Sequence, residues 1–198
     1  EYLKNTKAEE QPPLPTENNV LKTFSIENEP VVELVNNRER EYIFADLPDI
    51  GYSTDIDTVM ASSYQVKKQL QQIVKIEQPI TNTLLYKRIL RIWNLTRVTT
   101  RLQVFIDSLL EDAYKDPLSG DTIIYWEDKE KAKDCDFYRI NSKRDILDIP
   151  ILEVMSAARY AIEQQISMPT EDLKRLTSQL LGFSRKGNNL DMVTEHTI

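Results

Sequence analysis

The stretch that decides the fold reads IWNLTRVTTRL at residues 92–102, and a similar stretch, LLGFSRKGNNL, occupies residues 180–190. When the two are aligned, most apolar residues fall opposite apolar residues, and two pairs after the central turn match in chemistry: Thr96 with Ser184 and Arg97 with Arg185. A repeat of this kind indicates one supersecondary unit used twice. The order of helix, tight turn, hydroxyl cap and second helix predicts a helix-turn-helix in each copy.

The segment before the first copy has the spacing of two amphipathic helices. From Ser63 the apolar residues recur three or four positions apart and so share one helix face: Val66, Leu70, Ile73 and Val74. Pro79 is expected to end this helix, because proline disfavours helical geometry in the residue before it. Residues 81–83 offer caps for a second helix, whose inward side chains are predicted to be Leu85, Ile89, Ile92 and Trp93.

The turn that follows has matching residues in the two copies. Asn94 in the first copy and Gly182 in the second suit the left-handed conformation that ends a helix. Thr96 and Ser184 are then expected to cap the third helix of each copy with their hydroxyl groups.

A different pattern comes after the first copy. Residues 122–126 and 137–140 are rich in β-branched and aromatic side chains, and residues 127–134 between them are almost entirely charged. Two strands joined by a solvated loop predict a β-hairpin. A hairpin after three helices is the wing of a winged helix.

The second copy begins with Asp148 as a predicted cap and Pro150 near the first helical turn, a favoured place for proline. Its predicted inward residues are Val154, Met155, Ala158 and Ile162, then Leu173, Leu176 and Leu180, and finally Leu190 and Val193. The sequence thus predicts a mainly α fold with two tandem winged-helix-like three-helix units, of which the first has the hairpin wing. The expected division is an acidic linker or extended segment (1–60), the first unit (61–146) and the second unit (147–198).

The net charge of −7 is distributed unevenly along the chain. Residues 1–60 hold 5 basic and 13 acidic side chains, 5 − 13 = −8, whereas residues 61–198 hold 20 and 19, 20 − 19 = +1. The acidity therefore belongs to the N-terminal segment, and it does not exclude a basic patch on the helices.

Basic residues cluster on the first copy. Residues 81–106 hold five basic and no acidic side chains. Arginines and hydroxyl groups at a helix N-terminus suit phosphate oxygens, because the backbone N–H groups and the helix dipole favour anions. In the second copy Glu171 and Asp172 offset the basic residues, which favours a packing or protein-contact role there. The candidate DNA-contacting residues are Lys87, Arg88, Arg91, Arg97, Thr100, Arg101, Arg185 and Lys186.

Several separated motifs, in order, carry a resemblance to a known family: residues 76–80, 85–89, 95–97, 137–139, 148–150 and 181–185. Residues 64–198 resemble a domain of unknown function at the C-terminal end of large bacterial proteins related to superfamily I DNA helicases. The resemblance implies a place after a helicase motor and a restriction-endonuclease-like domain. A non-catalytic accessory domain that contacts DNA phosphates is the function expected, with other domains of a larger parent protein as partners.

The alternative is a protein-interaction or dimerisation module in which acids of the N-terminal segment or of a partner pair with the basic face. Enzymatic chemistry lacks candidates: the only histidine is His196, the only cysteine is Cys135, and no phosphate-binding glycine loop is present. We expect no cofactor and no metal. One cysteine and the lack of a signal peptide or long apolar run favour a cytoplasmic setting without a membrane. The absence of an initial Met indicates a fragment, with the second unit cut short at Ile198.

Overall fold

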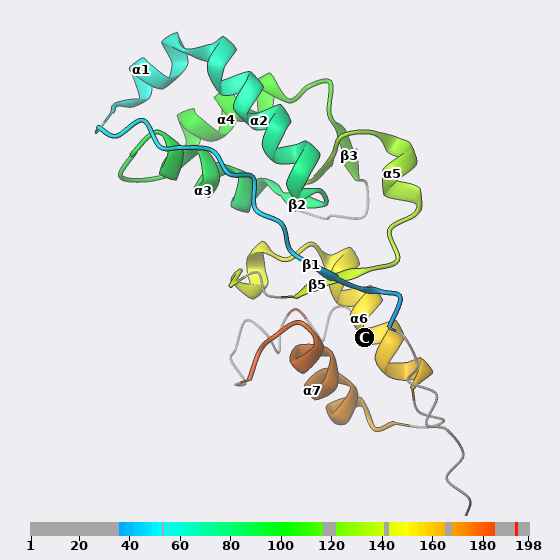
Figure 1. The fold of residues 1–198 in the computed structure, drawn as a ribbon. Helices are drawn as coiled ribbons and strands as arrows, with labels where there is room; N and C mark the ends of the chain where they lie inside the picture. Colours follow the sequence, from blue (N-terminus) through cyan, green and yellow to red (C-terminus); the bar gives the residue numbers. More distant parts are fainter. Residues whose placement is uncertain are drawn as a thin grey trace, which may run out of the picture. The chain divides into compact units, whose positions relative to one another are not determined.

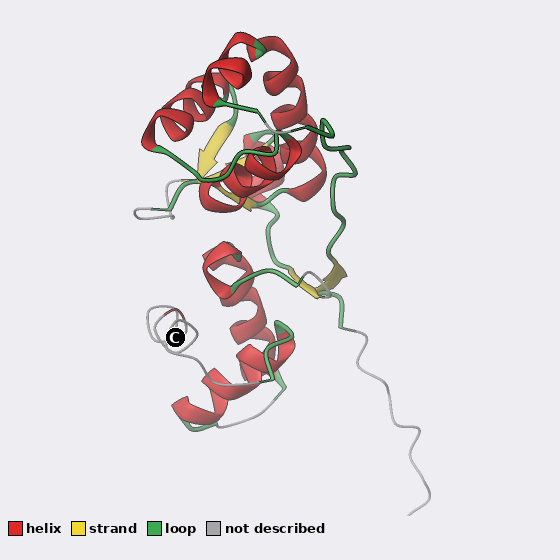
Figure 2. Cartoon of the chain, turned by 90° about the vertical axis from the view of Figure 1, so that its left-hand side faces the viewer, coloured by secondary structure: helices red, strands yellow, loops and turns green. Residues whose placement is uncertain are grey.

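The computed structural model describes residues 36–52, 54–116, 122–140, 143–164, 168–184 and 193. The chain divides into residues 1–35 and residues 36–198, and every described residue lies in the second unit. The elements are, in chain order, β1 (Glu39–Glu41), α1 (Ile56–Ala61), α2 (Ser63–Glu77), β2 (Ile80–Thr81), α3 (Asn82–Ile92), α4 (Thr100–Leu109), β3 (Tyr114–Asp116), β4 (Ile124–Trp126), α5 (Lys129–Lys133), β5 (Tyr138–Ile140), the 3-10 helix η2 (Ile146–Asp148), α6 (Ile151–Glu163) and α7 (Thr170–Leu180) (Figure 1). The described chain is mainly α, as predicted, with short strands between the helices (Figure 2). Its helices include none long and apolar enough to cross a membrane.

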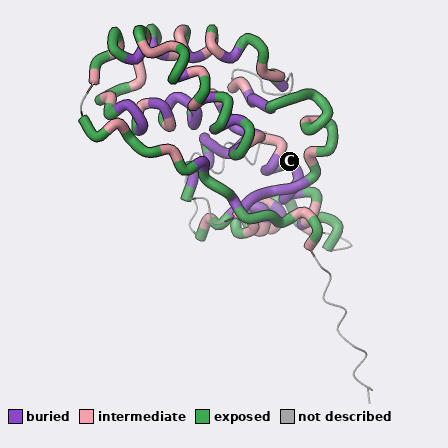
Figure 3. The backbone as a smooth tube through the Cα atoms, turned by 45° about the horizontal axis from the view of Figure 1, so that its top comes forward, coloured by how far each residue is buried: buried purple, intermediate pink, exposed green. Residues whose placement is uncertain are grey.

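Helices α2, α3 and α4 form the first core, with the apolar faces that the sequence predicts. All of the predicted inward residues of α2 and α3 are buried: Val66, Leu70, Ile73, Val74, Leu85, Ile89, Ile92 and Trp93. Buried and exposed residues alternate along these helices at helical spacing (Figure 3). Helix α2 ends before Pro79, and the Thr81 hydroxyl caps α3 by accepting from the Leu84 amide at 3.3 Å.

The turns after α3 and α7 are built alike, which confirms the predicted left-handed residues. Asn94 has φ 48° and Gly182 has φ 89°, and a side chain tolerates this region only at some cost. In the first turn the Leu95 amide donates to the Leu90 carbonyl, and in the second the Phe183 amide donates to the Ser178 carbonyl, both at 2.9 Å. The helix ends at the two copies therefore share one local structure.

Helix α4 begins later than predicted. Its cap is Thr99, whose hydroxyl accepts from the Leu102 amide at 3.2 Å, so the assignment of Thr96 as the cap is wrong. Leu95 and Val98 pack against the first core. Residues 95–98 therefore follow an irregular path, and the helix starts only after them. Ser184 is described, but the residues it was predicted to cap lie outside the described ranges.

The predicted hairpin between residues 122–126 and 137–140 is wrong. Strand β4 is the centre of an antiparallel three-stranded sheet of order β2-β4-β3, whereas β5 pairs in parallel with β1. The charged stretch between β4 and β5 forms helix α5, capped by Asp128, which accepts from the Lys131 amide at 2.9 Å. An i,i+4 ion pair of Glu127 with Lys131 supports this helix. The charged stretch is therefore a helix rather than a hairpin loop.

Helices α6 and α7 pack around a second core that includes Tyr138, Val154 and Ala157. Val154, Ala158 and Leu173 are buried as predicted, Leu176 and Leu180 are half-buried, and Val193 packs against the core, while Leu190 lies outside the described residues. Met155 and Ile162, however, are 39% and 53% exposed, which corrects their predicted inward position. The buried face of α6 instead includes Glu153, Ala157 and Ala161. Glu153 can lie on this face because its carboxylate forms buried ion pairs with two arginines.

The start of α6 also differs from the expectation. Pro150 is the residue immediately before the helix, and Asp148 does not cap it. Asp148 belongs to η2, where its carboxylate is buried and paired with Lys87. The acid at this position thus stabilises a contact with α3 instead of a helix end.

Candidate nucleic-acid interface

The basic residues predicted on α3 do not share one exposed surface. The Lys87 ammonium lies 2.7 Å from both carboxylate oxygens of the buried Asp148, so this side chain joins α3 to η2. Thr83 points its hydroxyl at the same carboxylate. Lys87 is thus held in an ion pair within the chain, although half of its side chain is exposed.

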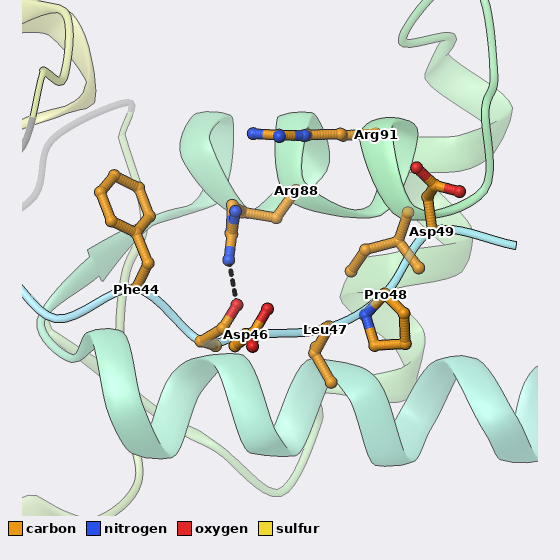
Figure 4. A pocket seen from close by; sticks show the side chains of 9 residues that line it. Phe44, Asp46, Leu47, Pro48, Asp49, Arg88 and Arg91 are labelled. Atoms are coloured by element: carbon orange, nitrogen blue, oxygen red, sulfur yellow. Dashed lines mark hydrogen bonds between the residues drawn. The ribbon is translucent and has the colours of Figure 1, made fainter. Parts of the chain in front are cut away.

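Arg88 is a half-buried residue held in an ion pair within the chain, which corrects its assignment to the phosphate-contacting face. Its side chain is 13% exposed and lies 2.8 Å from the Glu77 carboxylate, which is fully buried. The guanidinium also donates to the Ala45 carbonyl at 2.5 Å (Figure 4). Because Glu77 also accepts from the Tyr42 hydroxyl and the Ala45 amide, the two charges are hydrogen-bonded on several sides.

Arg91, Arg97, Thr100 and Arg101 are exposed. Arg91 lies in the last turn of α3, Arg97 lies in the irregular stretch before α4, and Arg101 lies in the first turn of α4. Arg101 pairs with Asp57 at 2.8 Å, and both side chains remain more than half exposed. Within the described ranges, the side chains of Arg91 and Arg97 make no hydrogen bond or ion pair. Arg185 and Lys186 lie outside these ranges.

Arg97 precedes the helix and Arg101 is its second residue, so the two side chains do not share a helical face. The two arginines lie on either side of the helix start, where the Thr99 hydroxyl accepts a hydrogen bond from the Leu102 amide, one of the amides without a partner inside the helix. The remaining amides of the first turn and the dipole favour a negative charge at this end of α4.

The one acid on α4 is turned away from this end. The Asp107 carboxylate accepts from the Tyr86 hydroxyl at 2.7 Å and from the Tyr125 hydroxyl at 3.0 Å. Burial, and then the Asp107 carboxylate, raise the pKa of both tyrosines above its usual value. These bonds fix α4 against α3 and β4, and they were not foreseen from the sequence. The exposed side of α4 carries Thr100, Arg101, Val104 and Ser108.

A cavity of about 520 Å³ lies between α3 and residues 44–49. Its lining includes Arg91 together with Asp46 and Asp49, and Figure 4 shows Arg88 reaching to the backbone of residues 44–49 while Arg91 lies along the helix. Because carboxylates accompany the arginines, this cavity is a poor pocket for an anion. Among the residues that the structure describes, no group of three or more His, Cys, Asp or Glu could hold a metal ion.

A buried charge network connects β5 and α6. Arg139 and Arg144 both pair with Glu153, which is fully buried, and Arg144 does so with two nitrogens at 2.8 and 2.9 Å. Burial disfavours the charged carboxylate, but the two arginines outweigh burial and hold the pKa of Glu153 below its usual range.

Arg139 extends this network to α2 and to the strap, the name used here for residues 36–52 and 54–57. Its guanidinium donates to the carbonyl oxygens of Glu77 and Pro79 at 2.7 and 2.6 Å. The Tyr42 ring of the strap lies 4.7 Å from the Arg139 guanidinium and 4.2 Å from that of Arg144. The strap is therefore fastened to both cores by buried side chains.

Comparison with known protein families gives a match over part of the chain. Residues 61–104 are similar to a family described as a protein of unknown function, DUF3320. The matched stretch covers α2, β2, α3 and the start of α4, which is less than half of the chain and agrees with the expected domain of unknown function. No curated protein matches the chain. No solved structure matches it either.

Proposed function

We propose that residues 61–126 form a winged-helix-like unit. Its support is the order of elements, α2, β2, α3, α4, β3 and β4, together with the antiparallel sheet order β2-β4-β3. In this reading the wing is the hairpin of β3 and β4, in place of the one predicted between residues 122–126 and 137–140. Helix α4 is then the helix that would enter a DNA groove.

The proposed function is that of a non-catalytic accessory domain that contacts DNA phosphates through Arg91, Arg97, Thr100 and Arg101. The observation that carries it is the start of α4, where Arg97 and Arg101 are exposed at a helix N-terminus while Asp107 is held against the core. Phosphate contacts of this kind position a protein on DNA without reading its sequence. The resemblance to helicase-related proteins suggests a larger cytoplasmic parent that supplies the motor and nuclease activities.

A salt titration tests this function. We expect a labelled duplex to bind the protein at low salt, with log affinity falling against log salt at a slope of about −2 to −3, because three phosphates are neutralised. The double substitution Arg97→Ala and Arg101→Ala is expected to reduce the size of the slope by about 2 and to remove most of the affinity. Fluorescence anisotropy over a series of salt concentrations measures both quantities.

The matched control is Arg159→Ala, which removes an exposed, ion-paired arginine from α6. This variant is expected to bind like the unaltered protein. Equal losses of affinity in the control and in the double variant would show that net charge alone governs binding. If the unaltered protein binds no duplex at low salt, the proposed function is refuted.

A second candidate is a protein-interaction module, and the exposed apolar residues of α6 favour it. Met155 and Ile162 lie seven positions apart and therefore on the same side of the helix. Light scattering at two protein concentrations distinguishes a self-associating module, whose mass rises with concentration, from a monomer.

A further inference from the structure

The strap runs beside the residues of the proposed DNA face and is held there at several points. The Ile50 amide donates to the Ile92 carbonyl at 2.9 Å, and the Thr54 hydroxyl donates to the Trp93 carbonyl. Arg88 fixes the backbone of Ala45. The end of α3 is thus bonded to the strap through its carbonyl groups, just before the turn at Asn94 that leads to α4.

This part of the strap is acidic and meets the exposed arginines. Asp57, in the first turn of α1, reaches Arg101 at 2.8 Å, and Asp46 and Asp49 line one cavity with Arg91. Asp55 is committed to capping α1 through the Thr58 amide at 2.8 Å, so it is not a competitor for Arg101. Among the exposed arginines of the proposed face, Arg97 alone has no acid of the strap beside it in the described structure.

We propose that the strap is an intramolecular competitor for DNA phosphate, with Asp57 as the residue that occupies Arg101. This inference rests on the proposed function and adds its regulation. A phosphate oxygen and the Asp57 carboxylate need the same guanidinium N–H groups, so DNA must displace Asp57 before Arg101 can contribute. Arg97 would make the first phosphate contact, and Arg101 would follow when α1 moves away.

The expected size of the effect is modest because the pair is exposed. Exposed ion pairs contribute little, so releasing Arg101 should tighten binding by about two- to fivefold at low salt. The salt slope should stay close to that of the unaltered protein, because Arg101 neutralises the same phosphate in both proteins once Asp57 has been displaced. The more specific sign is that the gain depends on Arg101, since a general loss of negative charge would tighten binding with or without that side chain.

The test is Asp57→Asn, which removes the charge and keeps the shape, measured by anisotropy with the same labelled duplex. The matched control is Asp112→Asn, which removes an acid from another exposed ion pair, with Lys67, beyond the other end of α4. We expect Asp57→Asn to bind more tightly with an unchanged salt slope, and Asp112→Asn to bind like the unaltered protein. In an Arg101→Ala background the gain from Asp57→Asn should vanish.

Each other outcome overturns the inference. An Asp57→Asn variant that binds like the unaltered protein, a gain that survives Arg101→Ala, or an equal gain in Asp112→Asn would each leave the proposed function standing and remove the competitor role. A complete lack of duplex binding by all variants would refute the proposed function itself, and the inference with it.

Discussion

The substitution Glu153→Gln is expected to lower the free energy of unfolding by about 3–5 kcal/mol, the cost of breaking a buried ion pair from one side. Glu153 is fully buried and compensates the charges of Arg139 and Arg144, whose side chains are 6% and 1% exposed. A neutral amide of the same shape would leave both guanidinium groups in the core without an opposing carboxylate on α6.

The interaction of Glu153 with these two arginines also sets the expected pH dependence of stability. Because the pKa of Glu153 is lowered in the folded state, the pair stabilises the protein above the ordinary carboxyl pKa of about 4.3. This stabilisation is lost as the pH falls through the folded pKa, where the carboxylate takes up a proton. Glu153→Gln should therefore narrow the stability difference between neutral and acid pH, and urea unfolding at several pH values measures it.

Glu163→Gln is the matched control, since Glu163 lies on the same helix and pairs with Arg38 at the surface. We expect the free energy of unfolding to fall much less in this variant, because solvent screens an exposed ion pair. Similar losses in the two variants, or an unchanged stability in Glu153→Gln, would show that the buried network does not hold β5 to α6.

Tyr42→Ala is expected to have an effect of similar size, about 3–5 kcal/mol, as for other truncations of large buried aromatic side chains. The Tyr42 ring is 5% exposed and lies against the guanidinium groups of Arg139 and Arg144, and its hydroxyl donates to Glu77 at 2.5 Å. Its loss opens a cavity between the strap and the first core and removes a hydrogen bond to a buried carboxylate.

Tyr42→Phe separates the two contributions, because it keeps the ring and removes only the hydroxyl. We expect it to cost about 1.5–3 kcal/mol, the usual range for a hydrogen bond to a charged group. Hydrogen exchange of the strap amides should rise strongly in Tyr42→Ala and less in Tyr42→Phe. A strap that exchanges equally in both variants and in the unaltered protein would contradict the role of Tyr42 as its anchor.

The parts of the fold that the sequence predicts correctly are those set by local rules. The helical spacing of Val66, Leu70 and Ile73 and the left-handed residues Asn94 and Gly182 depend on neighbours within a few positions. The strand pairing depends on distant partners. Strand β4 looks like a strand in the sequence, but its partner β3 reads Tyr-Lys-Asp, in which two of the three residues are disfavoured in strands.

The candidate site likewise has residues that local sequence rules identify and contacts that depend on distant parts of the chain. A local count of charges finds Arg91, Arg97 and Arg101, which the structure leaves exposed. It could not separate them from Arg88, because the acid that pairs with Arg88 lies on another helix, Glu77 of α2. Nor could it find the pairing of Lys87 with Asp148, two residues 61 positions apart that meet only in the folded chain.

The most direct test of DNA contact at the start of α4 is a titration of the isotope-labelled protein with a short duplex, followed amide by amide by NMR. The proposed function predicts that the amides of residues 97–104 and the side-chain Nε signals of Arg97 and Arg101 shift first and furthest, while those of α6 and α7 stay in place. Shifts confined to α6, or an unchanged spectrum at low salt, would contradict it.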